Sequence, residues 1–142
     1  ATGRIVVDRR HLHPGGFVHG GVWTALGDTA AAWATFRNIP VGHNFTTVEL
    51  KLNVFSAGLE GDEIVATAEP LHVGRSTVVI EVRMERRREG AEPRLAANLI
   101  VTQFVPAVRL FTWLLSTFAV CAPEQAANTR SVFGRCWPTS DG

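Results

Sequence analysis

The residues best suited to chemistry in this sequence are a His19-Gly20-Gly21 turn and an aspartate, Asp28, nine residues after the histidine. If a helix begins at this turn, its first backbone N–H groups have no partner within the helix, and the helix dipole adds about half a positive charge there. Glycine would let a carbonyl oxygen approach these donors closely, as an oxyanion site requires. A glycine pair before a helix is also an ordinary turn, so both interpretations stay open.

The helix that would carry Asp28 is predicted from Gly20 to about Arg37, because the segment is rich in alanine and its larger apolar residues recur at helical spacing. Those residues, expected to form one apolar stripe, are Val22, Leu26, Ala30 and Trp33. Asp28 would lie mid-helix, where aspartate has poor propensity and cannot cap an end. Its neighbours on the same face are small enough for a ligand or a second helix to approach: Gly21, Thr24, Ala25, Ala31, Ala32 and Thr35. The alternative is a solvated aspartate on the outer side of an amphipathic helix.

The spacing between Gly20 and Asp28 has a consequence for assembly. The two residues are eight positions apart, which is roughly 12 Å along one helix, so a single reacting carbon cannot contact both. Two antiparallel copies of the helix across a twofold axis would bring Gly20 of one subunit beside Asp28 of the other, twice per dimer. The spacing therefore predicts an obligate dimer with shared sites.

One short strand pattern precedes the helix and four longer ones follow it. The segment from Thr46 to Phe55 alternates strictly, with Val48, Leu50, Leu52 and Val54 on one face and Thr47, Glu49, Lys51 and Asn53 on the other. The other strands are expected at Gly3 to Val7, Glu63 to Val73, Thr77 to Arg88 and Leu95 to Val105, with a loop from Asp8 to Val18. The first three strands after the helix should form an antiparallel meander. A long helix packed on one antiparallel sheet is an α+β arrangement.

These features together resemble a known family. The HGG run, the helical aspartate nine residues on, the strand that begins Thr46-Thr47-Val48 and the Gly74-Arg75 hairpin are similar to the phenylacetate-pathway type of hotdog-fold acyl-CoA thioesterase. The resemblance covers Gly3 to Pro106. It implies a hotdog fold and hydrolysis of acyl-CoA thioesters without a cofactor. It also implies a subunit-interface site in a homodimer or homotetramer.

The resemblance also implies roles for individual residues. The Gly20 N–H would polarise the thioester carbonyl, with Gly21 beside the substrate, and Asp28 would act as nucleophile or as general base for water. Thr47 would face the helix and orient the acid or the water. The Gly74-Arg75-Ser76 turn would lie near the CoA nucleotide. His13 stands where the family commonly has asparagine, and could make similar hydrogen bonds.

The histidines also raise the question of a metal, because His11, His13 and His19 lie within nine residues. No Cys, Asp or Glu stands at metal-ligand spacing from them, so no metal is predicted, and His19 is expected to make a structural hydrogen bond. His43 and His72 are expected at the surface or at strand ends. Trp23 and Trp33 are expected to pack in the core.

Composition and charge limit which other functions and locations the sequence allows. The net charge of +1 gives no field for binding nucleic acid, and the basic run Arg86-Arg87-Arg88 is expected to be a solvated turn. Cys121 and Cys136 show no metal or redox spacing, and no apolar run is long enough to span a membrane. A soluble cytoplasmic protein is expected. Residues 1–106 are predicted to be a hotdog domain, N-terminally truncated relative to the family, and residues 107–142 a tail that we cannot place.

Two alternative functions stay open. An acyl-thioester dehydratase or hydratase can use the same fold, although such enzymes pair a histidine with an acid in one site. A non-catalytic acyl-CoA sensor could keep the fold without turnover. Neither the acyl group, aromatic or short to medium chain, nor the choice between dimer and tetramer can be read from the residues.

Overall fold

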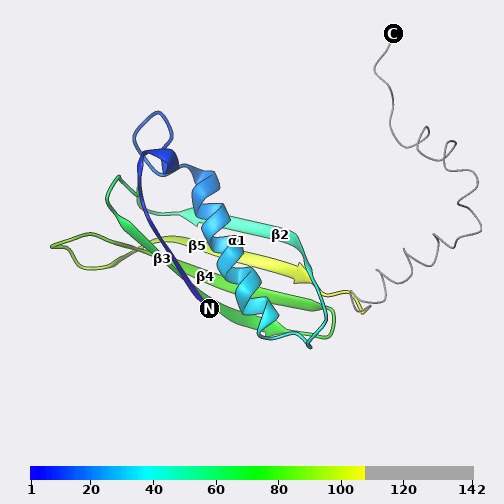
Figure 1. Cartoon of the computed structure of the whole chain (residues 1–142). Coiled ribbons are helices and arrows are strands. Elements are labelled where there is room, and N and C mark those ends of the chain that lie inside the picture. The colour runs from blue at the N-terminus through cyan, green and yellow to red at the C-terminus, as the bar shows by residue number, and fades with distance from the viewer. Residues whose placement is uncertain (108–142) are drawn as a thin grey trace, which may run out of the picture. The chain divides into compact units, whose positions relative to one another are not determined.

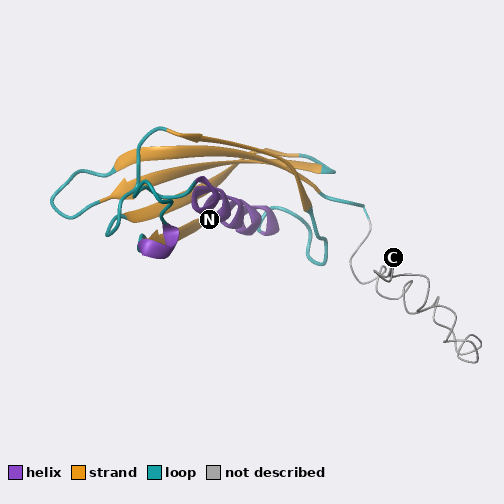
Figure 2. Ribbon diagram, turned by 90° about the horizontal axis from the view of Figure 1, so that it is seen from above, coloured by secondary structure: helices purple, strands orange, loops and turns teal. Residues whose placement is uncertain are grey.

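The computed structural model describes residues 1–107, in which one α-helix packs on one face of a five-stranded antiparallel sheet (Figures 1 and 2). The elements are β1 (Thr2–Val6), the 3-10 turn η1 (Arg9–His11), α1 (Gly20–Phe36), β2 (Thr46–Val54), β3 (Glu63–Val73), β4 (Thr77–Arg87) and β5 (Arg94–Phe104). Each predicted strand and the helix end within one residue of their expected bounds, and the α+β class is confirmed. The turn η1 was not predicted. No helix within residues 1–107 is long and apolar enough to cross a membrane.

The order of the strands corrects the predicted meander. The sheet order is β1-β3-β4-β5-β2, so β2 pairs with β5 and lies at an edge, rather than beside β3. The meander is instead formed by β3, β4 and β5, whose connections are short. Hydrophobic alternation shows which residues face the core, but it carries no information about which strand lies next to which. The short strand β1 occupies the free edge of β3.

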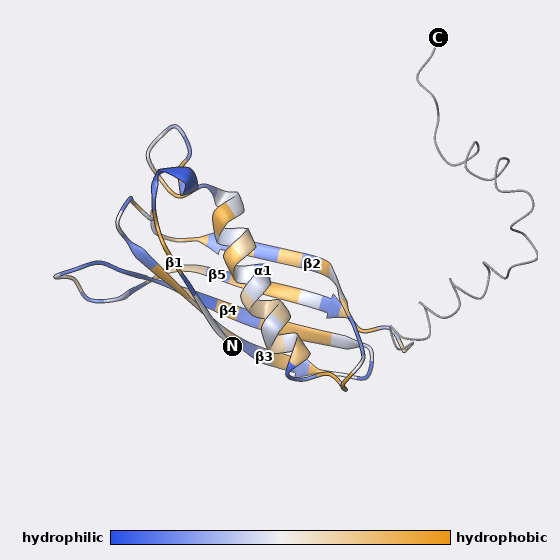
Figure 3. Cartoon of the chain, in the orientation of Figure 1, coloured by the Kyte–Doolittle hydropathy of each residue, from blue (hydrophilic) through white to orange (hydrophobic). Residues whose placement is uncertain are grey.

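The interface between helix and sheet is built from small residues on the helix and branched residues on the strands, and Figure 3 shows the hydrophobic strand residues lying beneath α1. A side chain at Gly27 would collide with Leu99, since a Cβ there would lie 2.7 Å from Leu99 Cδ2. Other small helix residues, Ala30, Ala31 and Ala34, are buried on the same interface. The predicted apolar stripe is therefore partly wrong. Trp23 is buried as expected, but Trp33 is 63% exposed, because the sheet packs against the small residues instead.

A β-bulge in β2 changes which of its residues face the helix. The pairing with β5 is regular from Glu49 onward, but Val48 is skipped between Thr47 and Glu49. An extra residue at a bulge reverses the alternation beyond it. Val48, predicted to face the core, is 60% exposed, whereas Thr47 lies on the helix side with Leu50. The predicted strict alternation is wrong at this point, and the helix-facing position that the resemblance implied for Thr47 is correct.

An ion pair fastens the loop between β2 and β3 to the end of β4. Asp62 is fully buried, accepts the Leu59 N–H at 2.8 Å, and accepts two hydrogen bonds from Arg88 at 2.7 and 2.9 Å. Burial raises the pKa of the Asp62 carboxyl, but the hydrogen bonds from Arg88 and Leu59, with the charges of Arg88 and Arg86, outweigh it and lower that pKa. The basic run is thus not only a solvated turn.

Asp62→Asn should lower the free energy of unfolding by about 2 kcal/mol at neutral pH, because the buried charged hydrogen bonds from Arg88 are lost. The ionised carboxylate stabilises the fold fully at pH values above the pKa of an unfolded aspartate, 3.8. This contribution is lost as the pH falls through the lower pKa of the folded state. Thermal denaturation at pH 7 and pH 3 checks this. The difference in melting temperature between wild type and variant should shrink at pH 3, and an unchanged difference would contradict the account. Arg94→Ala is a matched surface control.

Candidate active site

The central pair of the site joins the helix to the bulged strand. Asp28 lies mid-helix and half-buried, and the Thr47 hydroxyl donates to Asp28 Oδ1 at 3.1 Å. The bulge places Thr47 there, because regular alternation would point it to the opposite face of the sheet. Asp28 is therefore not simply a solvated residue on an outer face. Its carboxylate keeps acceptor positions that the Thr47 hydroxyl does not use.

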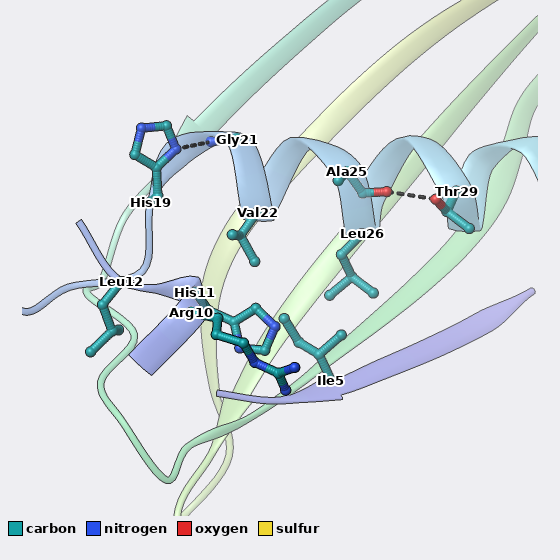
Figure 4. Close-up of a pocket in the computed structure, with 10 residues that line it drawn as sticks. All are labelled: Ile5, Arg10, His11, Leu12, His19, Gly21, Val22, Ala25, Leu26 and Thr29. Carbon is teal, nitrogen blue, oxygen red and sulfur yellow. Dashed lines mark hydrogen bonds between the residues drawn. The ribbon is translucent and has the colours of Figure 1, made fainter. Parts of the chain in front are cut away.

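The start of α1 separates the roles of the two glycines. His19 is the N-cap, and its Nδ1 accepts the Gly21 N–H at 2.9 Å (Figure 4). The Gly20 N–H donates to no other described residue, and a Cβ at Gly20 would meet nothing within 4 Å. Of the two glycines, Gly20 is thus the one with an open N–H, and it is the one to which the resemblance assigned the donor, whereas the Gly21 N–H is bound to the His19 cap.

The three clustered histidines share one structural role. In each ring Nδ1 accepts a backbone N–H. His11 accepts the Asp8 N–H at 3.0 Å, His13 accepts the Gly15 N–H at 2.9 Å, and His19 accepts the Gly21 N–H. These hydrogen bonds shape the loop before α1, where His13 also packs against Phe17 at 5.6 Å between ring centroids. A nitrogen that accepts an N–H has no lone pair left for a metal. Within residues 1–107 no three His, Cys, Asp or Glu side chains are placed to hold a metal ion.

The residues assigned to the CoA nucleotide gather at the hairpin end of the sheet. Arg75 and Ser76 line a cavity of about 560 Å³ with His43 and with residues at the end of β5. Gly74 has a structural reason to be glycine, since a Cβ would lie 2.7 Å from His72 Nε2 and 3.1 Å from the Thr77 carbonyl. His43 is half-buried rather than a plain surface residue, and its Nδ1 has no hydrogen-bond partner within the described chain. The exposed position of His72 is as expected.

A second cavity, of about 690 Å³, lies between β1, the η1 turn and the near side of α1 (Figure 4). Its lining includes two residues of the predicted site, His19 and Gly21, together with Arg10 and His11. It includes neither the Gly20 donor nor the Asp28–Thr47 pair. This cavity therefore reaches the start of α1 but not the carboxylate of the candidate site.

Comparison with known proteins decides the family. Residues 15–92 match the family model described as the thioesterase superfamily, which is more than half of the chain. The chain belongs to the thioesterase superfamily. The matched segment contains the cap, the aspartate, the bulged strand and the Gly74 hairpin, so Gly20, Asp28 and Thr47 lie within the matched part.

Individual relatives of this thioesterase-superfamily chain agree with the match. It is 35% identical over 86 residues to the putative esterase ComA2 of Bacillus subtilis, covering 58% of this chain and 66% of that protein. It is 31% identical over 89 residues to the 1,4-dihydroxy-2-naphthoyl-CoA hydrolase of Listeria monocytogenes, covering 63% and 72%. The chain thus spans just under two thirds of ComA2.

A solved structure supports the hotdog fold. The BH2602 protein from Bacillus halodurans, determined with CoA, superimposes with a TM-score of 0.65 at 26% sequence identity, over 76% of this chain and 68% of that chain. The helix packed on the antiparallel sheet is therefore the hotdog arrangement that the sequence resemblance implied.

One polar residue of this thioesterase-superfamily chain escaped the sequence reasoning. Gln103 is fully buried in β5, and both its Oε1 and its Nε2 lack a partner within the described residues. A signal was present, because Gln103 continues the inward positions Ala97, Leu99 and Val101 in steps of two. A glutamine in that series replaces an expected apolar residue.

Proposed function

We propose that this chain hydrolyses acyl-CoA thioesters at a site shared by two subunits. The observation that carries the proposal is the Asp28 carboxylate held by the Thr47 hydroxyl, on the same helix as the open Gly20 N–H. A carboxylate and a free backbone donor are the two groups that hydrolysis of a thioester needs, one to deliver the attack and one to stabilise the charge on oxygen.

The reaction follows from these two groups. The Gly20 N–H donates to the thioester carbonyl oxygen, and that hydrogen bond strengthens as the oxygen becomes negative. Asp28 from the other subunit then takes a proton from a water that attacks the carbonyl carbon, or attacks the carbonyl itself and forms an anhydride that water opens. The C–S bond breaks, the electron pair leaves on sulfur as the CoA thiolate, and the acyl group leaves as the free acid. Thr47 holds one carboxylate oxygen, so the other is aimed at the substrate.

The second subunit is proposed because the site is incomplete in one chain. Gly20 and Asp28 are eight residues apart on α1, roughly 12 Å along its axis. The edge strand β2 supports this assembly, because a free edge with exposed apolar residues favours pairing with another strand. The exposed apolar residues of β2 and the residue after it are Val48, Val54 and Phe55. Two exposed aromatic residues near the end of α1, Trp33 and Phe36, add to this apolar surface. We propose a second copy of this chain as the occupant.

The CoA nucleotide is assigned to the cavity beside Arg75 and Ser76. A guanidinium and a hydroxyl are suitable donors for phosphate oxygens, and Arg75 is exposed at the cavity rim. Gly74 keeps the hairpin tight, which holds both side chains beside His43. The nucleotide would then bind at one end of the sheet while the thioester reaches the bulge.

Arg75→Ala should raise KM for acyl-CoA about 10-fold and leave kcat within about twofold, because a phosphate contact contributes equally to ground and transition states. The same variant should leave KM for the matching acyl-pantetheine, which lacks the nucleotide, unchanged. Arg83→Ala, on the opposite face of the sheet, is the matched control. An equal rise in KM for both substrates would place the nucleotide elsewhere.

The acyl group is proposed to be aromatic, with short or medium alkyl chains next in order. The Listeria monocytogenes relative is named as a hydrolase of an aryl-CoA ester, and the sequence resembles a family that acts on phenylacetyl or hydroxybenzoyl groups. Thiol release from matched aryl- and alkyl-CoA esters tests this order. Binding of acyl-CoA without thiol release would instead support a sensor.

A further inference from the structure

The most unusual polar group in the described chain is the side-chain amide of Gln103. It is 0% exposed, and neither of its two polar atoms has a hydrogen-bond partner within residues 1–107. Buried amides almost always have partners, because leaving one unpaired costs the whole desolvation penalty of the group. A buried glutamine with both atoms unpaired is therefore retained for something other than stability.

The position of Gln103 places its side chain beside the candidate catalytic pair. Gln103 is directly opposite Thr47 in the antiparallel pairing of β5 with β2. Side chains directly opposite on one face have Cβ atoms about 5 Å apart, a separation that a glutamine side chain can span. Leu99, four residues earlier on the same face of β5, contacts the helix at Gly27, so Gln103 also faces α1. Its other neighbour is the buried Val78.

The hydrogen-bond capacity of Thr47 matches what Gln103 can supply. The Thr47 hydroxyl donates its only proton to Asp28, so its oxygen can only accept a further hydrogen bond. The Gln103 Nε2 is an unpaired donor on the neighbouring strand. A donor on Nε2 that reaches the Thr47 oxygen would keep the hydroxyl proton pointing at Asp28.

Other buried polar atoms of the described chain do not require this explanation. Thr35 Oγ1 is also unpaired, but a helical threonine can donate to the carbonyl four residues before it, as Thr24 and Thr29 do here. The unpaired nitrogen of His43 belongs to the cavity already assigned to the nucleotide. Gln103 alone lies opposite the residue that holds Asp28.

We infer that Gln103 is a positioning residue of the thioesterase site, whose amide donates to Thr47 and so orders a Gln103–Thr47–Asp28 chain when substrate binds. The inference rests on the proposed hydrolysis and extends it to a residue inside the sheet. No proton is transferred along the chain. The amide fixes the direction of the Thr47 hydroxyl, and the hydroxyl fixes which carboxylate oxygen faces the thioester.

Gln103→Met tests the inference, because methionine has a similar length and no strong donor. We expect kcat to fall about 3- to 10-fold, the value of one hydrogen bond, with KM within about twofold. The melting temperature should stay the same or rise, because an unpaired buried amide has been removed. A purely structural role predicts the opposite pattern, a lower melting temperature with kcat retained. Val78→Ala, which changes packing at the other neighbour of Gln103, should lower the melting temperature without the loss in kcat.

The coupling to Thr47 gives the decisive comparison. In a Thr47→Val background the change Gln103→Met should have no further effect on kcat, because the intermediate hydroxyl is already missing. Gln103→Asn, which keeps the amide on a shorter chain, should recover part of the loss. Equal effects of Gln103→Met in both backgrounds would overturn the inference while leaving the hydrolase assignment intact.

A measurement that needs no turnover separates the two proposals. The Gln103 side-chain NH2 resonances in an amide correlation spectrum are identified by their loss in Gln103→Met, and binding of a non-hydrolysable acyl-CoA thioether should displace them in wild type but much less in Thr47→Val. If wild type hydrolyses nothing yet this displacement occurs, the proposed function fails and the contact stands. If wild type is active and the resonances do not respond to Thr47→Val, the role of Gln103 is wrong.

Discussion

Replacing Gly20 with proline should reduce thioester hydrolysis about 100- to 1000-fold, the usual effect of removing one oxyanion donor. Proline replaces this N–H with a ring carbon and should leave the rest of the helix unchanged, because Gly20 is the first residue of α1 and proline is well tolerated there. The residue before a proline must be extended, and His19 already has φ −65° and ψ 141°. The backbone of α1 should therefore stay intact, and thiol release under saturating substrate measures the lost donor.

Gly20→Ala is the matched control, since it keeps the N–H and its Cβ would meet no atom within 4 Å. This variant should keep most of its activity, and both variants should have the wild-type helical circular dichroism. If Gly20→Pro is as active as Gly20→Ala, the Gly20 N–H does not stabilise the oxyanion, and a different donor must be sought at the site.

Asp28→Asn should reduce kcat about 100- to 10000-fold, because asparagine keeps the size of the side chain and its hydrogen bond from Thr47 but can neither accept the proton of water nor attack the carbonyl. Thiol release from the preferred CoA ester measures the effect, with oligomeric state checked by light scattering. Glu49→Gln, a change of the same kind on the exposed side of β2, should have little effect. Full activity of Asp28→Asn would contradict the role given to Asp28.

Combining these two variants tests the shared site. A subunit carrying Gly20→Pro keeps Asp28, and a subunit carrying Asp28→Asn keeps Gly20, so a mixed dimer contains one complete site and one doubly defective site. Equal co-expression should recover about a quarter of wild-type activity, because half of the dimers are mixed and half of their sites are complete. A site contained within one chain would show no recovery, since every chain then has a defect.

The local sequence pattern was sufficient to predict the helix and the strands of this protein. The helical spacing from Gly20 and the alternation in the segments that form β2 and β4 placed the boundaries of these elements within one residue, because the period of the apolar residues records one buried face. The HGG turn and Asp28 were also found from the residues alone. An aspartate is unfavourable in the middle of a helix, and a glycine pair at a helix start leaves backbone donors accessible, and both are local properties of the sequence.

Three features were decided only in the tertiary structure. The partner of β2 could not be read from its alternation, because pairing depends on which strand edge remains free. The small face of α1 was assigned to a ligand or second helix, yet Ala31 and Thr35 are buried and the large Trp33 is exposed, because the sheet approaches where side chains are smallest. The bulge at Val48 brings Thr47 to Asp28 and to the strand position opposite Gln103. A bulge is set by the pairing of two strands. The sequence of β2 therefore predicted a strand, but only its pairing with β5 determined which of its residues reach the site.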